Sequence, residues 1–161
     1  MNKALSLAVA ATLSCASLNS EAQTMIGKTT DVAAIANGDR MNAETLWAMG
    51  RIGGAAASPD GKTVVYQVGY YSVKQNKSHQ MLYTVSADGK KQHSLTTTAA
   101  SESDATWIDG GKRIAFLTGG QLWSMNADGT DRRQLTKSEI DIEGYIFSPD
   151  EQKVILIKSL P

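Results

Sequence analysis

An internal repeat constrains the fold of this chain more than any other feature of its sequence. The segments Leu82–Gly89 (LYTVSADG) and Leu122–Gly129 (LWSMNADG) align without gaps at a spacing of 40 residues. A second motif occurs three times, beginning at Ala57, Trp107 and Phe147, with steps of 50 and 40 residues between the copies. Its first two copies precede the two segments. The ten additional residues of the first step lie between 68 and 81, where we expect a longer polar loop. Repeat units of this size cannot bury their apolar faces alone, so neighbouring units should stack on one another.

Each unit is composed of short strands joined by tight turns. Strands are expected at 63–68, 82–85 and 93–96, and again at 113–118, 122–125 and 133–136. The pairs Asp60-Gly61 and Asp88-Gly89 favour hairpin turns, because glycine tolerates the positive φ that such turns need. Three to four short strands per unit are typical of a β-propeller blade. The repeat therefore predicts an all-β fold, a partial β-propeller of about two to three blades of four-stranded antiparallel sheets. A β-sandwich with similar hairpins is the alternative.

The first 22 residues have the order of charged, apolar and small residues found in a secretory signal peptide. Lys3 supplies a positive charge, residues 4–18 carry no charge, and Ser20 and Ala22 provide the small side chains of a cleavage site. The apolar run is too short to span a bilayer. We therefore expect cleavage after Ala22 and export across the inner membrane to the periplasm. The alternatives are a buried N-terminal helix and a lipoprotein anchored through Cys15.

The remaining chain divides into three parts. Residues 23–41 are turn-rich and low in aromatic residues, and we expect them to form a flexible arm. A short leading helix is expected within residues 42–52, with Asn42 as its N-cap and Arg51–Gly54 ending it. Residues 53–161 should form the propeller blades. Because the sequence stops directly after the third strand motif, we expect the chain to be the truncated front part of a longer protein.

Composition disfavours several classes of function. Lys+Arg and Asp+Glu both number 16, so no basic excess exists to neutralise the phosphates of a nucleic acid. The single cysteine lies in the expected signal peptide, which argues against a disulfide scaffold and against a thiolate metal site. Residues Asn126–Asp131 space oxygen-bearing side chains somewhat like a calcium loop, but glycine stands at the fourth position instead of the sixth. A hairpin turn is the favoured interpretation, and we expect no metal and no cofactor.

Aromatic and acidic residues are the remaining candidates for binding. Four aromatic residues recur at matching repeat positions, which favours packing between neighbouring sheets over ligand stacking: Trp107, Trp123, Tyr66 and Tyr83. Trp47 and Met49 on the leading helix suit contact with a partner domain as well as burial against the repeats. The loops between the repeats are acidic, and solvation is the expected state of their carboxylates, at Glu102, Asp104, Glu139, Asp141 and Glu143.

These motifs resemble the opening of prolyl oligopeptidase family serine peptidases, with the greatest likeness to secreted bacterial enzymes of the dipeptidyl peptidase 5 type. The likeness rests on a helix ending in Leu-Trp-x-Met-x-Arg-Ile at 46–52, on the motif at Ala57–Tyr66, and on the segments at 122–135 and 147–150. It covers roughly residues 42–158. The Ser-Pro-Asp-Gly-Lys motif alone is shared by many propellers, including the periplasmic protein of the Tol system.

The resemblance implies an N-terminal propeller followed by an α/β-hydrolase domain with a Ser-Asp-His triad. This sequence contains no Gly-x-Ser-x-Gly nucleophile elbow, and its histidines, His79 and His93, fall in the expected polar loop and in an expected strand. No catalytic residue can therefore be assigned, and the chain alone should be inactive.

The function implied by the resemblance is that of a propeller which gates and orients short peptides for the missing hydrolase domain. The alternative is a non-enzymatic periplasmic propeller that binds partner proteins. A genuine 161-residue protein would require its blades to pair in trans, because repeat units bury their faces only against neighbours.

Overall fold

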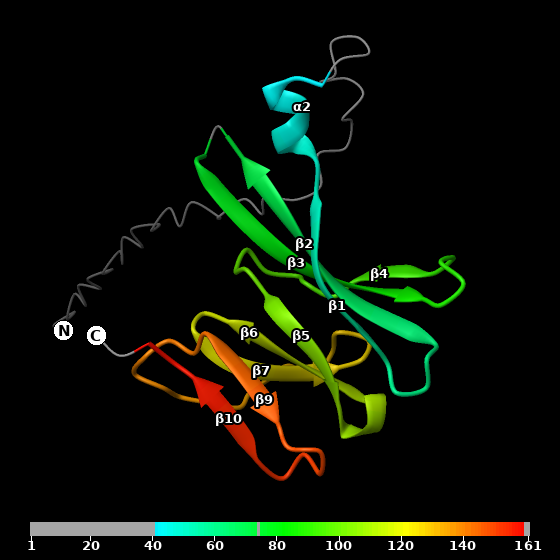
Figure 1. Ribbon diagram of the computed structural model, residues 1–161, viewed down its shortest axis with the longest axis vertical. Coiled ribbons are helices and arrows are strands. Elements are labelled where there is room, and N and C mark those ends of the chain that lie inside the picture. Colours follow the sequence, from blue (N-terminus) through cyan, green and yellow to red (C-terminus); the bar gives the residue numbers. More distant parts are fainter. Residues whose placement is uncertain (1–40, 74, 160–161) are drawn as a thin grey trace, which may run out of the picture.

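The computed structural model describes residues 41–73 and 75–159 (Figure 1). The helix α2 (Ala43–Ala48) begins at Asn42, whose Oδ1 accepts a hydrogen bond from the Thr45 amide at 2.7 Å. Asn42 is therefore the N-cap that the sequence predicts. Among the helices in these ranges, none has the length and apolar character needed to cross a membrane. The expected signal peptide, Cys15 and nearly all of the expected arm lie outside the described residues.

The strands form three antiparallel sheets that follow one another along the chain. The first sheet has the order β1 (Arg51–Ala57), β2 (Thr63–Ser72), β3 (Lys77–Ser86) and β4 (Gln92–Ser94). The second has the order β5 (Ser103–Ile108), β6 (Arg113–Thr118), β7 (Gln121–Asn126) and β8 (Arg133–Gln134), with the short 3-10 helix η1 (Asp109–Gly111) between β5 and β6. The third sheet consists of β9 (Gly144–Phe147) and β10 (Val154–Ile157).

The internal repeat is confirmed at the level of individual strands. Leu82 lies on the third strand of the first sheet and is fully buried, and Leu122 lies on the third strand of the second sheet with 1% exposure. The strands β9 and β10 correspond to the first two strands of a further unit. The prediction of a mainly β fold with four-stranded antiparallel sheets is therefore confirmed, although the described residues form no closed ring.

The prediction of a polar loop between residues 68 and 81 is wrong, because this segment extends the β2–β3 hairpin. The two strands stay paired from Thr63 opposite Ser86 to Ser72 opposite Lys77. Tyrosine favours a half-buried strand, and the extension buries Tyr70, which is 8% exposed. The extension also supports α2, which lies beside the tip of the hairpin (Figure 1).

The strand β1 was not expected from the sequence. The leading helix ends at Ala48, with Met49 as its C-cap, and the segment Arg51–Gly54 that was expected to end it instead starts β1, which pairs antiparallel with β2. The register shifts between Ile52 and Ala55, at the Gly53-Gly54 pair. A Cβ on Gly53 would lie 2.4 Å from the Gln67 amide nitrogen, so a larger residue at this point of the strand would have to displace the Gln67 side chain.

Two apolar cores hold the three sheets together in series. The first core joins residues of the first and second units, namely Val65, Leu82, Leu95, Ile114, Phe116 and Met125. The second core joins the second unit to β9, with Ala115, Leu117, Leu122, Ile142 and Tyr145 as its buried members. Successive residues of β6 point to opposite faces of the sheet and so enter different cores. The second sheet is therefore covered on both faces, which a two-layer β-sandwich does not explain.

Candidate functional site

The turns that follow β1, β3 and β9 share one hydrogen-bonding pattern, built from the repeated Ser-x-Asp sequence. In the β1–β2 turn, Ser58 Oγ donates to Asp60 Oδ1 at 2.7 Å, and the Lys62 amide donates to the same oxygen at 3.1 Å. The Thr63 amide donates to Ser58 Oγ at 3.0 Å. The same three bonds recur around Ser86–Asp88 and Ser148–Asp150. Each of these serine hydroxyls donates a hydrogen bond to an aspartate and accepts one from a backbone amide, so the motif serves turn formation.

We expect the stability of the chain to fall as acid protonates these aspartates. The Ser58 hydroxyl and then the Lys62 amide hold the pKa of Asp60 below its ordinary value of 3.8, and Asp88 and Asp150 have lowered pKa values for the same reasons. Because these pKa values are lower in the folded chain, the unfolded chain binds protons more readily. The stabilisation that the ionised aspartates provide is therefore complete above about pH 4, and it is lost as the pH falls through their pKa values in the folded chain.

Thermal unfolding measured from about pH 5 down to pH 2 checks this expectation. The control is Asp60→Asn, which keeps an acceptor for the turn but removes one titrating group, and it should make the decline shallower. A melting temperature that stays constant over this range would contradict the assignment.

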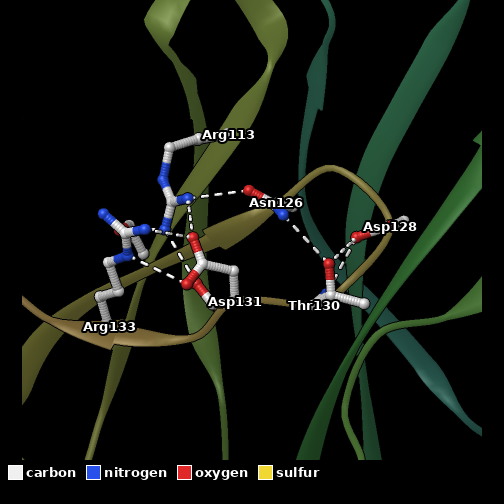
Figure 2. A network of polar contacts seen from close by, with 7 residues as sticks. Arg113, Asn126, Asp128, Thr130, Asp131 and Arg133 are labelled. Atoms are coloured by element: carbon white, nitrogen blue, oxygen red, sulfur yellow. Dashed lines mark hydrogen bonds and ion pairs between the residues drawn. The ribbon is translucent and has the colours of Figure 1, made fainter.

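The β7–β8 turn resembles these turns but has Asn126 at the position of the serine (Figure 2). The amide and the hydroxyl of Thr130 donate to Asp128 Oδ1 at 3.0 and 2.6 Å. Asn126 Nδ2 in turn donates to the Thr130 hydroxyl at 3.0 Å. The segment Asn126–Asp131 therefore forms the hairpin turn that the sequence favours over a calcium loop. No group of three or more metal-binding side chains gathers in the described part of the chain.

Asp131 connects this turn to the neighbouring strands. Figure 2 shows two guanidinium groups on its carboxylate, that of Arg133 at 2.7 Å and that of Arg113 at 2.9 Å. Arg133 and then Arg113 lower the pKa of Asp131. Arg113 also donates to Asn126 Oδ1 at 2.8 Å and to Ser124 Oγ at 3.0 Å. The donors of this cluster are therefore used within the protein, and its role is to fix the β6–β7–β8 connection.

A groove of about 610 Å³ lies between the turns of the first and second sheets and contains His93 on β4, the strand where the sequence places it. Trp107 forms part of its lining, together with Ser58 and Ser86. Both serine hydroxyls donate to the turn aspartates. The pKa values of Asp60 and Asp88 are lowered, so both carboxylates are weak bases, and each serine oxygen also accepts a backbone amide hydrogen bond, so these contacts do not prepare either serine for attack.

His79 lies in β3 and not in a loop, which corrects the sequence prediction. It is 3% exposed, and its Nε2 lies 3.1 Å from the Ala100 carbonyl oxygen. This contact joins the extended hairpin to the connection between β4 and β5, and it gives the imidazole a structural role.

Glu102 also differs from the expectation of a solvated loop, because it is 2% exposed. The Thr96 hydroxyl donates to Glu102 Oε2 at 2.7 Å, and Arg132 forms an ion pair with the other carboxylate oxygen. The Arg132 guanidinium lies over the Phe116 ring, 5.0 Å from its centroid. With Trp123, these groups line a pocket of about 490 Å³ beside the first core. Sequence reasoning missed Arg132, because no local pattern relates two residues that lie 30 positions apart in the chain.

The other acidic residues that were expected in loops are exposed, at Asp104, Glu139, Asp141 and Glu143, although Asp104 lies in β5 and not in a loop. Asp104 stands out by its backbone, with a φ of 54° at the register shift in β5. Its carbonyl oxygen accepts a hydrogen bond from the Tyr145 hydroxyl at 2.5 Å, and the same hydroxyl lies 2.8 Å from the Ala115 carbonyl oxygen. The unusual backbone of Asp104 therefore ties β5 to the third sheet.

The repeated aromatic residues divide into two groups. Trp107 and Trp123 pack against the core between the sheets, as predicted, and Trp107 Nε1 donates to the Ala56 carbonyl at 2.9 Å. Tyr66 and Tyr83 instead stack on each other across β2 and β3, with ring centroids 5.6 Å apart. They lie on the face of the first sheet that no other described sheet covers, so their predicted packing between sheets is not observed.

The aromatic residue of the leading helix stays exposed although it contacts β2. Trp47 is 41% exposed and meets the Tyr71 ring edge-on, with a centroid distance of 5.5 Å. The Arg51 guanidinium lies 4.9 Å from the Trp47 ring and 4.5 Å from the Tyr71 ring. Met49 is also only partly covered. This arrangement attaches α2 to the extended hairpin and still leaves part of Trp47 accessible.

Comparison with curated proteins gives two relatives, whereas no protein-family model matches the chain. The chain is 41% identical over 119 residues to dipeptidyl-peptidase 5 of Porphyromonas endodontalis, and 40% identical over 127 residues to dipeptidyl-peptidase 5 of Porphyromonas gingivalis. The aligned stretches cover 71% and 76% of this chain but only 17% and 19% of those proteins.

Solved structures support the same fold. An acylaminoacyl peptidase of Pyrococcus horikoshii superposes with a TM-score of 0.58 at 14% identity, over 71% of this chain and 18% of that chain. A putative TolB of Agrobacterium tumefaciens superposes with a TM-score of 0.51 at 20% identity, over 64% of this chain and 36% of that chain. These likenesses concern the fold alone. The identity found among the curated relatives confirms the resemblance seen in the sequence: over about three quarters of its length this chain is related to dipeptidyl-peptidase 5, of which it spans about a fifth.

Proposed function

We propose that this chain forms the first part of a β-propeller in a serine exopeptidase of the dipeptidyl-peptidase 5 type. The observation that carries the proposal is the 40% identity over 127 residues to the Porphyromonas gingivalis protein. An acylaminoacyl peptidase structure and the putative TolB structure, whose likeness shows the fold alone, are 13% and 20% identical to this chain, and the higher identity to dipeptidyl-peptidase 5 supports a common function as well.

The stacking of the sheets supports the propeller part of this proposal. The second sheet packs on the first sheet through one face and on the third sheet through its opposite face. In β6, Phe116 enters the core with the first sheet and Ala115 enters the core with the third. Continued repetition of one junction turns a stack of sheets into a ring. A closed ring excludes folded proteins and admits thin chains. We therefore propose that the complete propeller gates and orients short peptides, while a separate α/β-hydrolase domain performs the acyl transfer.

A non-enzymatic propeller that binds partner proteins is the second candidate. The structural likeness to the putative TolB favours it, with a TM-score of 0.51. The peptidase is preferred because the identity to that structure is 20%, half of the identity to the dipeptidyl peptidases.

We also propose that the protein is exported to the periplasm. The support for this location is the order of residues in the first 22 positions, from Lys3 through the uncharged run to Ala22. Dipeptide release from external peptides would fit such a location.

The function is tested by comparing the 161-residue chain with the product of its extended reading frame on chromogenic dipeptidyl substrates. The extended protein should cleave substrates with a free amino terminus, with a kcat on the order of 10 s⁻¹. A serine-directed inhibitor should abolish this activity. The 161-residue chain should show no turnover, because its sequence contains no Gly-x-Ser-x-Gly nucleophile elbow.

Matched substrates whose amino terminus is acylated provide the control, since the solved relatives include acylaminoacyl peptidases. Faster cleavage of the acylated substrates would contradict the proposed preference for a free amino terminus. Absence of turnover by the extended protein on either form would favour the binding propeller. Inhibitor-sensitive turnover by the 161-residue chain would contradict the proposal outright.

A further inference from the structure

The turns of the sheets contain the same reactive dipeptide at four places, Asp60-Gly61, Asp88-Gly89, Asp109-Gly110 and Asp128-Gly129. Aspartate followed by glycine is prone to isomerisation, because glycine has no side chain to shield its amide nitrogen. That nitrogen attacks the side-chain carbon Cγ of the aspartate, and water leaves as a cyclic imide closes. Water then adds to either carbonyl of the imide, so the product is aspartate or isoaspartate of unchanged mass.

Three of these turns restrain both reacting groups. In the β1–β2 turn the Asp60 carboxylate accepts two hydrogen bonds, and the Gly61 amide donates to the Ser58 carbonyl oxygen at 2.8 Å. The same restraints recur around Asp88 and Asp128. The hydrogen bonds to these three carboxylates lower their pKa values, and an ionised carboxylate is a poor target for the amide nitrogen.

The turn between β5 and β6 restrains neither group. Within the described ranges, the Asp109 carboxylate accepts no hydrogen bond, and its one ion pair is with Lys112 Nζ at 4.0 Å. The Asp109 side chain is 57% exposed, so water reaches it. The Gly110 amide has no acceptor among the same residues, and the turn is closed by the Lys112 amide, which donates to the Asp109 carbonyl oxygen at 3.2 Å.

The repeat explains why this turn differs. Ile108 stands where the neighbouring copies of the motif have Ser58 and Ser148. Isoleucine has no hydroxyl that could hold the side chain of a following aspartate, and the Ile108 side chain makes no cap to η1. The second copy therefore keeps an Asp-Gly pair but lacks the residue that restrains it in the other two.

We propose that Asp109 is the position at which the folded chain converts aspartate to isoaspartate, whereas the other three Asp-Gly pairs are protected by their turns. Isoaspartate adds one methylene to the main chain at a point where three units meet. The Asp109 amide donates to Glu151 Oε2 in the third unit at 2.7 Å. Gly111 packs so closely on Pro59 of the first unit that a Cβ would lie 3.0 Å from Pro59 Cδ. The conversion therefore disturbs the contacts of this turn with both neighbours.

Peptide mapping of the 161-residue chain after several weeks at mildly acidic pH tests the proposal. Isoaspartate peptides keep their mass, elute separately and resist a protease that cleaves before aspartate. Isoaspartate at Asp109 should accumulate at least about fivefold faster than at the other three pairs, because a hydrogen bond must open first in their turns. In urea all four pairs should react at similar rates, since only the fold distinguishes them.

Two variants provide matched controls. Asp109→Glu should remove the isoaspartate signal of this turn, because glutamate would have to close a larger and slower ring. Ser58→Ala removes the hydroxyl that holds Asp60, so isoaspartate at Asp60 should rise severalfold while the rate at Asp109 stays the same. Circular dichroism establishes that each variant is folded. If Ser58→Ala does not fold, the comparison of the folded chain with the chain in urea still decides the question.

Three results would overturn the proposal. One is the absence of isoaspartate at Asp109 in the folded chain. Another is accumulation at any of the other three pairs that is as fast as at Asp109. The third is a preference for Asp109 that persists in urea, which would assign the reactivity to the local sequence and not to the turn. Peptidase activity enters none of these measurements, so this proposal and the proposed function fail separately.

Discussion

Replacing Leu95 by alanine should destabilise the chain by about 2–5 kcal/mol, whereas the same change at Leu135 should cost less than about 1 kcal/mol. The two leucines occupy the same repeat position, 40 residues apart. Their backbones are held alike, since the Leu95 amide donates to the Leu82 carbonyl and the Leu135 amide donates to the Leu122 carbonyl, both at 2.8 Å. Yet Leu95 is 1% exposed and Leu135 is 47% exposed.

The two leucines differ in exposure because only one of them is covered by a following sheet. Leu95 is covered by the β7–β8 turn of the next sheet, where a Cβ on Gly129 would lie 3.3 Å from its Cδ2 atom. The third sheet has only β9 and β10 in the described chain, so no equivalent turn covers Leu135. Truncation of Leu95 leaves a cavity in a packed core, whereas truncation of Leu135 removes a side chain that is already half in water.

Urea unfolding followed by tryptophan fluorescence measures both losses. Equal losses at the two positions would contradict the packing of the sheets in series. In an extended chain with a complete third sheet, the loss at Leu135 should rise toward the loss at Leu95. This comparison therefore also tests the propeller without an activity assay.

Features with a local cause could be predicted from the sequence. The Asp60-Gly61 and Asp88-Gly89 turns depend on residues in immediate sequence contact, and both glycines have positive φ, 68° and 73°. The cap at Asn42 is equally local. The repeat spacing then placed Leu82 and Leu122 on equivalent strands, because similar segments adopt similar local structure.

Features that depend on distant partners could not be predicted in this way. The segment between 68 and 81 is polar in composition, but α2 and the β4–β5 connection pack against it and make it a strand pair. The strand β1 lacks an alternating pattern, because its Gly53-Gly54 pair leaves no side chains to alternate. Tyr66 and Phe116 share a repeat position but not an environment, since the place of a sheet in the stack decides what covers it.

The Glu102–Arg132 pair supplies the second large effect. Arg132→Ala should destabilise the chain by about 3 kcal/mol, because it leaves a carboxylate that is 2% exposed without its cation. The neighbouring Arg133→Ala is the matched control and should cost less than about 1 kcal/mol. Arg133 also pairs with a carboxylate, that of Asp131, but its side chain is 66% exposed and water replaces the lost contact.

A double substitution separates the charge from the packing of Arg132. Its guanidinium covers the Phe116 ring as well as pairing with Glu102, so alanine removes two contacts at once. Arg132→Met combined with Glu102→Leu keeps apolar bulk and removes both charges. Replacing a buried ion pair by apolar groups is often neutral, so this variant should recover most of the stability lost in Arg132→Ala. If it is no more stable than Arg132→Ala in urea unfolding, the stranded carboxylate is not the cause of the loss. The junction between the sheets would then depend on the specific hydrogen bonds to Thr96 and Arg132, and not on apolar burial.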